Sequence, residues 1–167
     1  MLVHPDAESS IIAIFTLRDE AATARLGSAL ADALRQGDII ALEGALGMGK
    51  TVLARGLVRR LCGYETVVAS PTFTLVQIYD TPDFPLWHCD LYRIESDEDA
   101  IEIGLGEAFT EAATLIEWPE RLDSLLPSHH LRLKFIREEA DGSRIAELRG
   151  NPEWSRRLKG ISLDGQS

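Results

Sequence analysis

The feature that most constrains the fold is the stretch 44–51, Gly-Ala-Leu-Gly-Met-Gly-Lys-Thr, which fits the pattern G-x-x-x-x-G-K-[ST]. It follows the apolar run 39–42 and precedes a segment with helical periodicity. Its glycines let backbone N–H groups turn toward phosphate oxygens, and the following helix adds its positive end. A glycine-rich turn with Lys50 and Thr51 merely at the surface is the alternative. Because the pattern, the strand and the helix agree, we favour a phosphate-binding loop.

The loop side chains also suit this chemistry. The Lys50 ammonium can reach the β and γ oxygens of a nucleotide, and the Thr51 hydroxyl is placed to ligate Mg²⁺. Backbone donors supply the remaining contacts. We therefore expect the nucleotide-binding residues of the loop to be Gly44, Ala45, Leu46, Gly47, Met48, Gly49, Lys50 and Thr51.

Composition sets limits on partners. The 167 residues suit a single domain, 1–167, with ordinary hydrophobic (45%) and charged (26%) content. The net charge of −10, from 17 Lys and Arg against 27 Asp and Glu, is unusual. A surface of that sign repels a polyphosphate backbone. We therefore do not expect the chain to hold RNA or DNA alone.

The sequence favours a cytoplasmic location. The start of the chain has no basic segment followed by a long apolar one, and no apolar run approaches about 18 residues, the length that spans a bilayer. Cys62 and Cys89 form no C-x-x-C arrangement, and two reduced thiols suit a reducing compartment.

Periodicity and turn residues predict an α/β fold. Strands are expected at 11–15, 38–43, 66–69, 75–79, 86–90 and 112–117, with a hairpin of 131–135 and 144–148 turned by Asp141-Gly142. Helices are expected at 20–35, from the loop to Gly63, from 96 to a stop at Gly104 and Gly106, and at 152–158. Residues 1–10 and 160–167 are expected to be loose. The result is a single-domain P-loop nucleotide-binding fold with a mixed parallel and antiparallel sheet flanked by helices.

Two carboxylates end apolar strands. Asp90 closes the run 86–90, and Glu117 closes the run 113–117. Nucleotides bind at the carboxyl ends of strands in such sheets, and phosphate-loop enzymes hold their metal or its waters there. Each could instead be the first solvated residue after a strand. Mg²⁺ chemistry at the loop favours a function for both.

Four motifs together resemble a known family. They are residues 44–51, Ser70-Pro71-Thr72-Phe73-Thr74-Leu75, His88-Cys89-Asp90-Leu91-Tyr92-Arg93 and Ile116-Glu117-Trp118-Pro119-Glu120. Their order and approximate spacing resemble those of the bacterial tRNA threonylcarbamoyladenosine biosynthesis ATPase family, TsaE. The resemblance covers roughly residues 17 to 120, and four motifs in order are far more specific than the phosphate loop alone.

The resemblance implies a function and its partners. It implies a Mg²⁺-dependent ATP hydrolase that supports a threonylcarbamoyl transferase and its inactive homologue in modifying adenosine 37 of tRNA. The tRNA is then expected to meet this chain only indirectly, through those partners. The implied site residues are the catalytic Asp90, Glu117 and Lys50, the metal ligands Thr51 and Glu117, the switch-like Ser70, Thr72 and Thr74, and Glu20 near the adenosine.

Some positions depart from the family pattern. Ala45 replaces a usual aspartate, Met48 a usual alanine, and Val52 an often-found second threonine. Because loop amides surround the phosphates, nucleotide binding is expected to survive, whereas the role of that aspartate is in doubt. Cys89 replaces a usual aromatic residue and is expected only to pack.

The sequence argues against two of three rival functions and leaves the third open. A GTP switch needs an N-K-x-D guanine reader, but the only asparagine is Asn151, which precedes a proline. A small-molecule kinase needs an arginine-bearing lid, for which the sequence gives no sign. A nucleotide-sensing interaction module would differ only in lacking turnover. Arg93 is the only internal candidate for a cation at the γ-phosphate, so slow intrinsic turnover stimulated by partners is expected.

Overall fold

The computed structural model describes residues 9–122 and 124–163. Residues 1–8 and 164–167 of the segments expected to be loose lie outside this range. The strands are β1 (Ser10–Leu17), β2 (Ile39–Glu43), β3 (Val76–Asp80), β4 (Pro85–Asp90), β5 (Ala113–Glu117), β6 (Leu131–Arg137) and β7 (Arg144–Gly150). The helices are α1 (Glu20–Ala33), α2 (Lys50–Cys62), α3 (Asp97–Glu102), α4 (Leu105–Glu111), α5 (Pro152–Arg157) and a 3₁₀ turn, η1 (Pro119–Arg121).

The strands form one mixed sheet in the order β1-β7-β6-β2-β5-β4-β3. The inner strands β4, β5, β2 and β6 are parallel to one another, whereas β3, β7 and β1 pair antiparallel. The carboxyl ends of the parallel strands therefore share one edge. Because β7 runs against β6, β7 starts at that same edge, and β1 ends there. The expected α/β class with a mixed sheet is confirmed.

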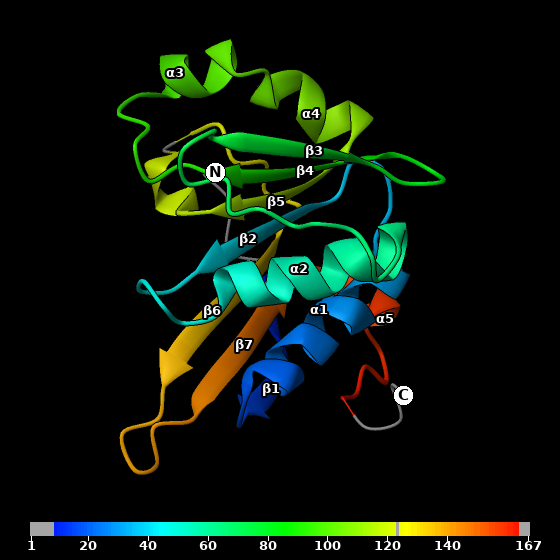
Figure 1. The fold of residues 1–167 in the computed structure, drawn as a ribbon, viewed down its shortest axis with the longest axis vertical. Coiled ribbons are helices and arrows are strands. Elements are labelled where there is room, and N and C mark those ends of the chain that lie inside the picture. Colours follow the sequence, from blue (N-terminus) through cyan, green and yellow to red (C-terminus); the bar gives the residue numbers. More distant parts are fainter. Residues whose placement is uncertain (1–8, 123, 164–167) are drawn as a thin grey trace, which may run out of the picture.

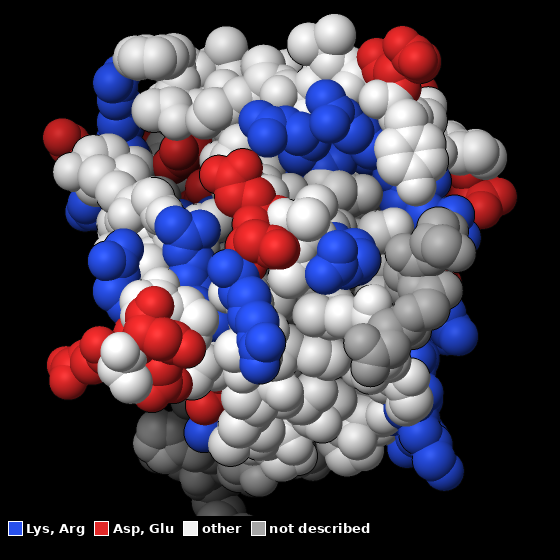
Figure 2. Space-filling model, turned by 60° about the horizontal axis from the view of Figure 1, so that its bottom comes forward, with Lys and Arg blue, Asp and Glu red and all other residues white. Residues whose placement is uncertain are grey.

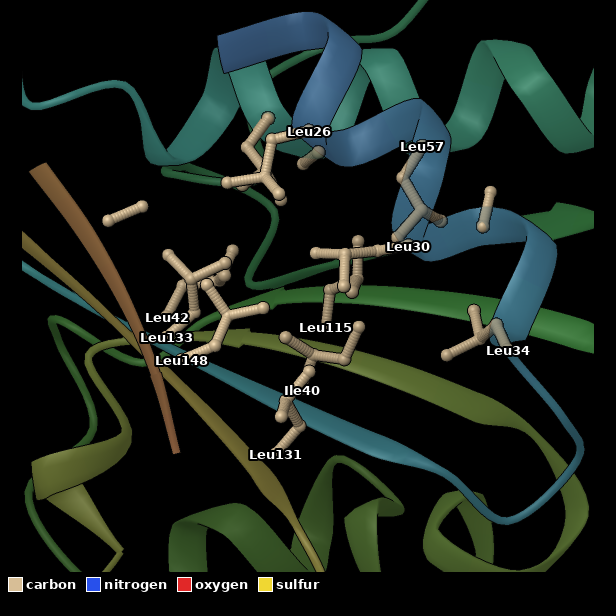
Figure 3. Packing of buried hydrophobic residues seen from close by; sticks show 14 of the residues in the cluster. Leu26, Leu30, Leu34, Ile40, Leu42, Leu57, Leu115, Leu131, Leu133 and Leu148 are labelled. Carbon is tan, nitrogen blue, oxygen red and sulfur yellow. The ribbon is translucent and has the colours of Figure 1, made fainter. Parts of the chain in front are cut away.

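Helices cover both faces of the sheet (Figure 1). On one face, α1 and α2 pack over the central strands, and Figure 3 shows their leucines meeting those of the sheet. On the other face, a second apolar cluster joins α3, α4 and the residues that flank η1, Trp118 and Leu122, to β2, β4 and β5. Alternate residues of β2, β4 and β5 thus enter opposite cores, as the period of two requires, whereas β6 contributes to the first core only.

Two glycines let α1 and α2 approach each other closely. A Cβ added to Gly27 would lie 2.1 Å from the Leu53 carbonyl oxygen, and one at Gly56 would lie 2.2 Å from that of Ala24. Any side chain at either position would separate the helices. This contact fixes α2, and with it the loop at its start, over the sheet.

Three expectations about local structure are wrong. Residues 66–69 form no strand, and Val67 is 85% exposed. Gly104 ends the first helix of its region as expected, with φ of 93°, but Gly106 lies inside a second helix, α4, that we did not expect. Within the tail expected to be loose, Ile161 and Leu163 pack against the core.

No helix among residues 9–122 and 124–163 is both long and apolar enough to cross a membrane.

Candidate nucleotide-binding site

The loop 44–51 joins β2 to α2 at the carboxyl edge of the sheet. Its three glycines all have positive φ: 150° at Gly44, 77° at Gly47 and 110° at Gly49. Gly49 is the N-cap of α2, so the start of the helix opens directly from the loop. Met48 turns its side chain into the core, being 5% exposed. The conformation is one that only glycines adopt freely, and loops of this kind can direct their amides toward an anion.

Lys50 bends back over the loop. Its Nζ donates a hydrogen bond of 2.8 Å to the Gly44 carbonyl oxygen and lies 3.8 Å from the centre of the Trp118 ring. Burial lowers the pKa of the Lys50 ammonium below its usual value, and the carboxylates of Glu117, Glu120 and Asp90 partly offset this. An anion at the loop would therefore find a lysine that is poorly solvated and ready to exchange a carbonyl for a phosphate oxygen.

The two strand-end carboxylates lie side by side. Asp90 and Glu117 are Cα partners across the parallel pair β4 and β5. Both are nearly buried, at 6% and 4% exposure. Asp90 accepts hydrogen bonds from the Tyr92 amide at 3.0 Å and the Thr72 hydroxyl at 3.3 Å. The view of each as a merely solvated strand end does not fit this burial.

Glu117 is held by a buried histidine. His88 lies two residues before Asp90 on β4, so its side chain shares the same face, and its Nε2 is 2.7 Å from Glu117 Oε2. His88 is fully buried, and its Nδ1 has no hydrogen-bond partner among the described residues. The sequence analysis did not single out His88, although its spacing of two from Asp90 on a strand is a usable signal.

The cavity at the loop has a volume of about 230 Å³. It brings together most of the expected site. Its lining consists of Glu20, Leu46, Gly47, Gly49, Lys50, Thr51, Val52, Thr72, Asp90, Glu117, Trp118 and Arg144. Gly44, Ala45 and Met48 do not line it. Thr51, Asp90 and Glu117 offer hydroxyl and carboxylate oxygens, the hard donors that Mg²⁺ prefers, so this set fits the expected ion.

A larger cavity of about 510 Å³ opens beside the first, on the outer side of α1 and α2. The two share only Glu20 and Val52, and the larger one contains neither the loop glycines nor the carboxylates. Four arginines line it: Arg25, Arg55, Arg59 and Arg60. Figure 2 shows that basic side chains gather in clusters between acidic ones despite the net charge of −10. We assign the chemistry to the smaller cavity because it contains the groups that phosphate and metal require.

The three residues expected to be switch-like differ in whether they are linked to the cavity. Thr72 lines the cavity and contacts Asp90, and Ser70 reaches it indirectly, with its Oγ 2.7 Å from Thr72 Oγ1. Thr74 does not line the cavity, and its hydroxyl accepts a hydrogen bond from Gln77. The segment 70–72 is therefore the part linked to the carboxylates.

The arginine in the cavity is not the one that we expected. Arg93 is exposed and lies over the Phe73 ring at 5.2 Å, outside the cavity. Arg144, the first residue of β7, lines the cavity instead. Nothing in the local sequence marked Arg144 beyond its place in the hairpin. Trp118, which has a φ of 61° and stacks on Lys50, was likewise missed as a site residue, although it directly follows Glu117.

Known proteins of one family match this chain. The family model described as threonylcarbamoyl adenosine biosynthesis protein TsaE matches residues 17–146, which include the loop, both carboxylates and Arg144. The chain belongs to the TsaE family. The match thus extends into the C-terminal hairpin, beyond the region in which the four motifs lie.

Individual TsaE relatives agree in sequence and structure. The chain is 45% identical to the tRNA threonylcarbamoyladenosine biosynthesis protein TsaE of Rickettsia bellii, over 67% of this chain and 78% of the relative. It is 36% identical to that of Bacillus subtilis, over 74% and 75%. Among solved structures, the crystal structure of Bacillus subtilis YdiB superposes with a TM-score of 0.74 at 26% identity, covering 90% of this chain and 93% of that one.

Proposed function

We propose that this chain is a Mg²⁺-dependent ATPase that acts in tRNA threonylcarbamoyladenosine modification at position 37, together with a threonylcarbamoyl transferase and its inactive homologue. The observation that carries the proposal is the convergence of Lys50, Asp90 and Glu117 on one cavity at the phosphate loop. Membership in the TsaE family supports the pathway, because the relatives are named for this biosynthesis.

The residues of the cavity divide the work of hydrolysis. The loop amides and Lys50 bind the phosphates, which requires Lys50 to leave the Gly44 carbonyl. Asp90 orients a water for in-line attack on the γ-phosphorus, and cleavage of the bond to the β-bridging oxygen releases ADP and phosphate. Thr51 and Glu117 would hold Mg²⁺, whose charge offsets that of the phosphate oxygens.

Adenine rather than guanine is the proposed base. The only asparagine, Asn151, is used elsewhere, since its side chain accepts a hydrogen bond of 2.9 Å from the Trp154 amide and caps α5. A guanine reader of the N-K-x-D type is therefore lacking. Glu20 lines the cavity at the start of α1 and is the proposed neighbour of the adenosine.

The isolated enzyme should turn over slowly. Fast phosphoryl transfer needs a cation at the developing γ-phosphate charge, worth about 10³ to 10⁵ in rate when a partner supplies it. Arg93 lies outside the cavity, over Phe73, and is a poor candidate, while Arg144, which does line the cavity, lies against Gly49 of the loop. We therefore propose that the transferase pair stimulates turnover and binds this chain better with ATP than with ADP. The net charge of −10 leaves the tRNA chiefly to those partners.

Steady-state phosphate release, with the purified transferase pair titrated in and a pull-down in each nucleotide, tests the proposal. The expected result is slow release alone and clear stimulation by the pair. A fast isolated enzyme that is indifferent to the pair and phosphorylates an added acceptor would make the chain a small-molecule kinase. Nucleotide binding without release, with or without the pair, would make it an interaction module.

A further inference from the structure

Arg144 on β7 places a positive charge against the phosphate loop, and no described residue forms an ion pair with it. Its Nη1 lies 3.5 Å from the position that a Cβ on Gly49 would occupy, so the guanidinium sits directly against the last glycine of the loop. Gly49 is the N-cap of α2, whose first amides point outward at that place. The positive end of the helix and a positive side chain thus converge on one point.

The fold brings Arg144 there from the far side of the loop. Arg144 is the Cα partner of Arg137 on β6 and of Leu17 on β1, which places it at the carboxyl edge of the parallel strands. In the sheet, β7 lies on the opposite side of β2 from β5 and β4, which hold the carboxylates. Arg144 therefore faces the loop from the wall opposite Asp90 and Glu117.

The Arg144 side chain has no polar partner in the part of the chain that the structure describes. Among residues 9–122 and 124–163 it makes no hydrogen bond, ion pair or ring contact, although it is half-buried. Glu20 lines the same cavity, and also a second one of about 190 Å³ that Arg144 shares with residues 17–19, yet no ion pair joins the two in this part of the chain. A half-buried guanidinium with five donors and no acceptor is unusual, and it sits where an anion is expected.

We propose that Arg144 binds the phosphate chain of the nucleotide at Gly49, closing it from the side opposite the metal. The inference rests on the proposed function. The planar guanidinium of Arg144 can donate two parallel hydrogen bonds to phosphate oxygens, which the Lys50 ammonium, as a point charge, cannot. We expect the phosphate oxygens at Gly49 to be ones that ADP and ATP share. Arg144 therefore acts in binding and positioning the nucleotide rather than on the γ-phosphate alone.

Calorimetric titration of ADP and of ATP into Arg144→Gln tests this role. The matched control is Arg137→Gln, which removes the same charge from the facing residue of the hairpin, where the side chain is exposed. Arg144→Gln should weaken both nucleotides by about 10- to 100-fold, the scale of losing charge-assisted hydrogen bonds, while Arg137→Gln binds like the wild type. Arg144→Lys should recover part of the affinity. Thermal unfolding without nucleotide should match the wild type, since no hydrogen bond or ion pair among the described residues is lost.

The outcomes separate the two proposals. Wild-type protein that binds neither nucleotide would refute the proposed function itself. Binding that Arg144→Gln retains in full would refute only the role of Arg144. Loss of ATP binding with ADP binding intact would also overturn it, because the contact would then lie on the γ-phosphate alone. Equal losses in Arg144→Gln and Arg137→Gln would mean a general charge effect and would overturn the specific contact.

Discussion

The two walls of the phosphate cavity are built differently. On the β4 and β5 wall, Asp90 and Glu117 are nearly buried and each is held by hydrogen bonds, from Thr72 and the Tyr92 amide in one case and with His88 in the other. On the opposite wall, Arg144 of β7 is half-buried, and Glu20 at the start of α1 is exposed. The wall that would carry metal and water is thus organised before ligand arrives, as electrostatic catalysis requires. On the role proposed for Arg144, a bound nucleotide would complete the other wall.

The largest effect should come from the organised wall. We expect Glu117→Gln and Asp90→Asn to lower turnover by about 10² or more, the scale of losing a charge-stabilising group. Both amides keep the size of the side chain, so thermal unfolding should change little. Phosphate release and unfolding must be measured on the same sample.

A loss of stability without a loss of activity would show that the two walls do not differ in function. If Glu117→Gln unfolds at a much lower temperature yet keeps its activity per folded molecule, the carboxylate serves only the fold. Thr74→Val is a matched control for the site, because Thr74 lies near in sequence but outside the cavity.

A substitution of His88 tests whether the contact that holds Glu117 in place matters for metal binding. Removing the partner of a metal-binding group typically costs about 10- to 100-fold in metal affinity, so His88→Ala should raise the Mg²⁺ concentration needed for half-maximal activity by that factor. Thermal stability should also fall, because the Glu117 carboxylate stays buried without its partner.

His88→Gln, which keeps a donor, should recover part of the Mg²⁺ dependence. His129→Ala provides a control outside the cavity, since that ring contacts the Gly37 carbonyl. If the Mg²⁺ dependence is unchanged in His88→Ala, Glu117 does not need His88 to orient it for metal binding.

The smallest effect concerns the stability of the unliganded loop. A lysine pKa lowered by burial means that the charged form is less favourable in the folded chain than in water, so its contribution to folding improves only as pH rises from the lowered pKa toward the usual value. Lys50→Met should therefore not lower the melting temperature at neutral pH, although nucleotide affinity is lost. Differential scanning calorimetry without nucleotide measures this. A clear drop would mean that the contacts with Gly44 and Trp118 outweigh the cost of burial.

The sequence predicted most elements, and the misses have physical causes. Residues 66–69 have the β-branched pattern of a strand, but the sheet ends at β3 and offers them no partner. The helix α4 contains Gly106, which reads locally as a stop. It forms because Leu105, Ala108 and Phe109 bury one face against the sheet, and this packing outweighs the low helix propensity of glycine.

By itself, the sequence determined the groups that act through local geometry. The loop 44–51 needs only its own glycines and the helix after it, and Asp90 and Glu117 each end a strand that the sequence pattern predicts. Only the tertiary structure decided which residue lies on the wall of the cavity opposite these carboxylates. Arg144 reaches Gly49 only because the hairpin of β6 and β7 pairs with β2 on one side and with β1 on the other, and these pairings join strands that are distant in sequence.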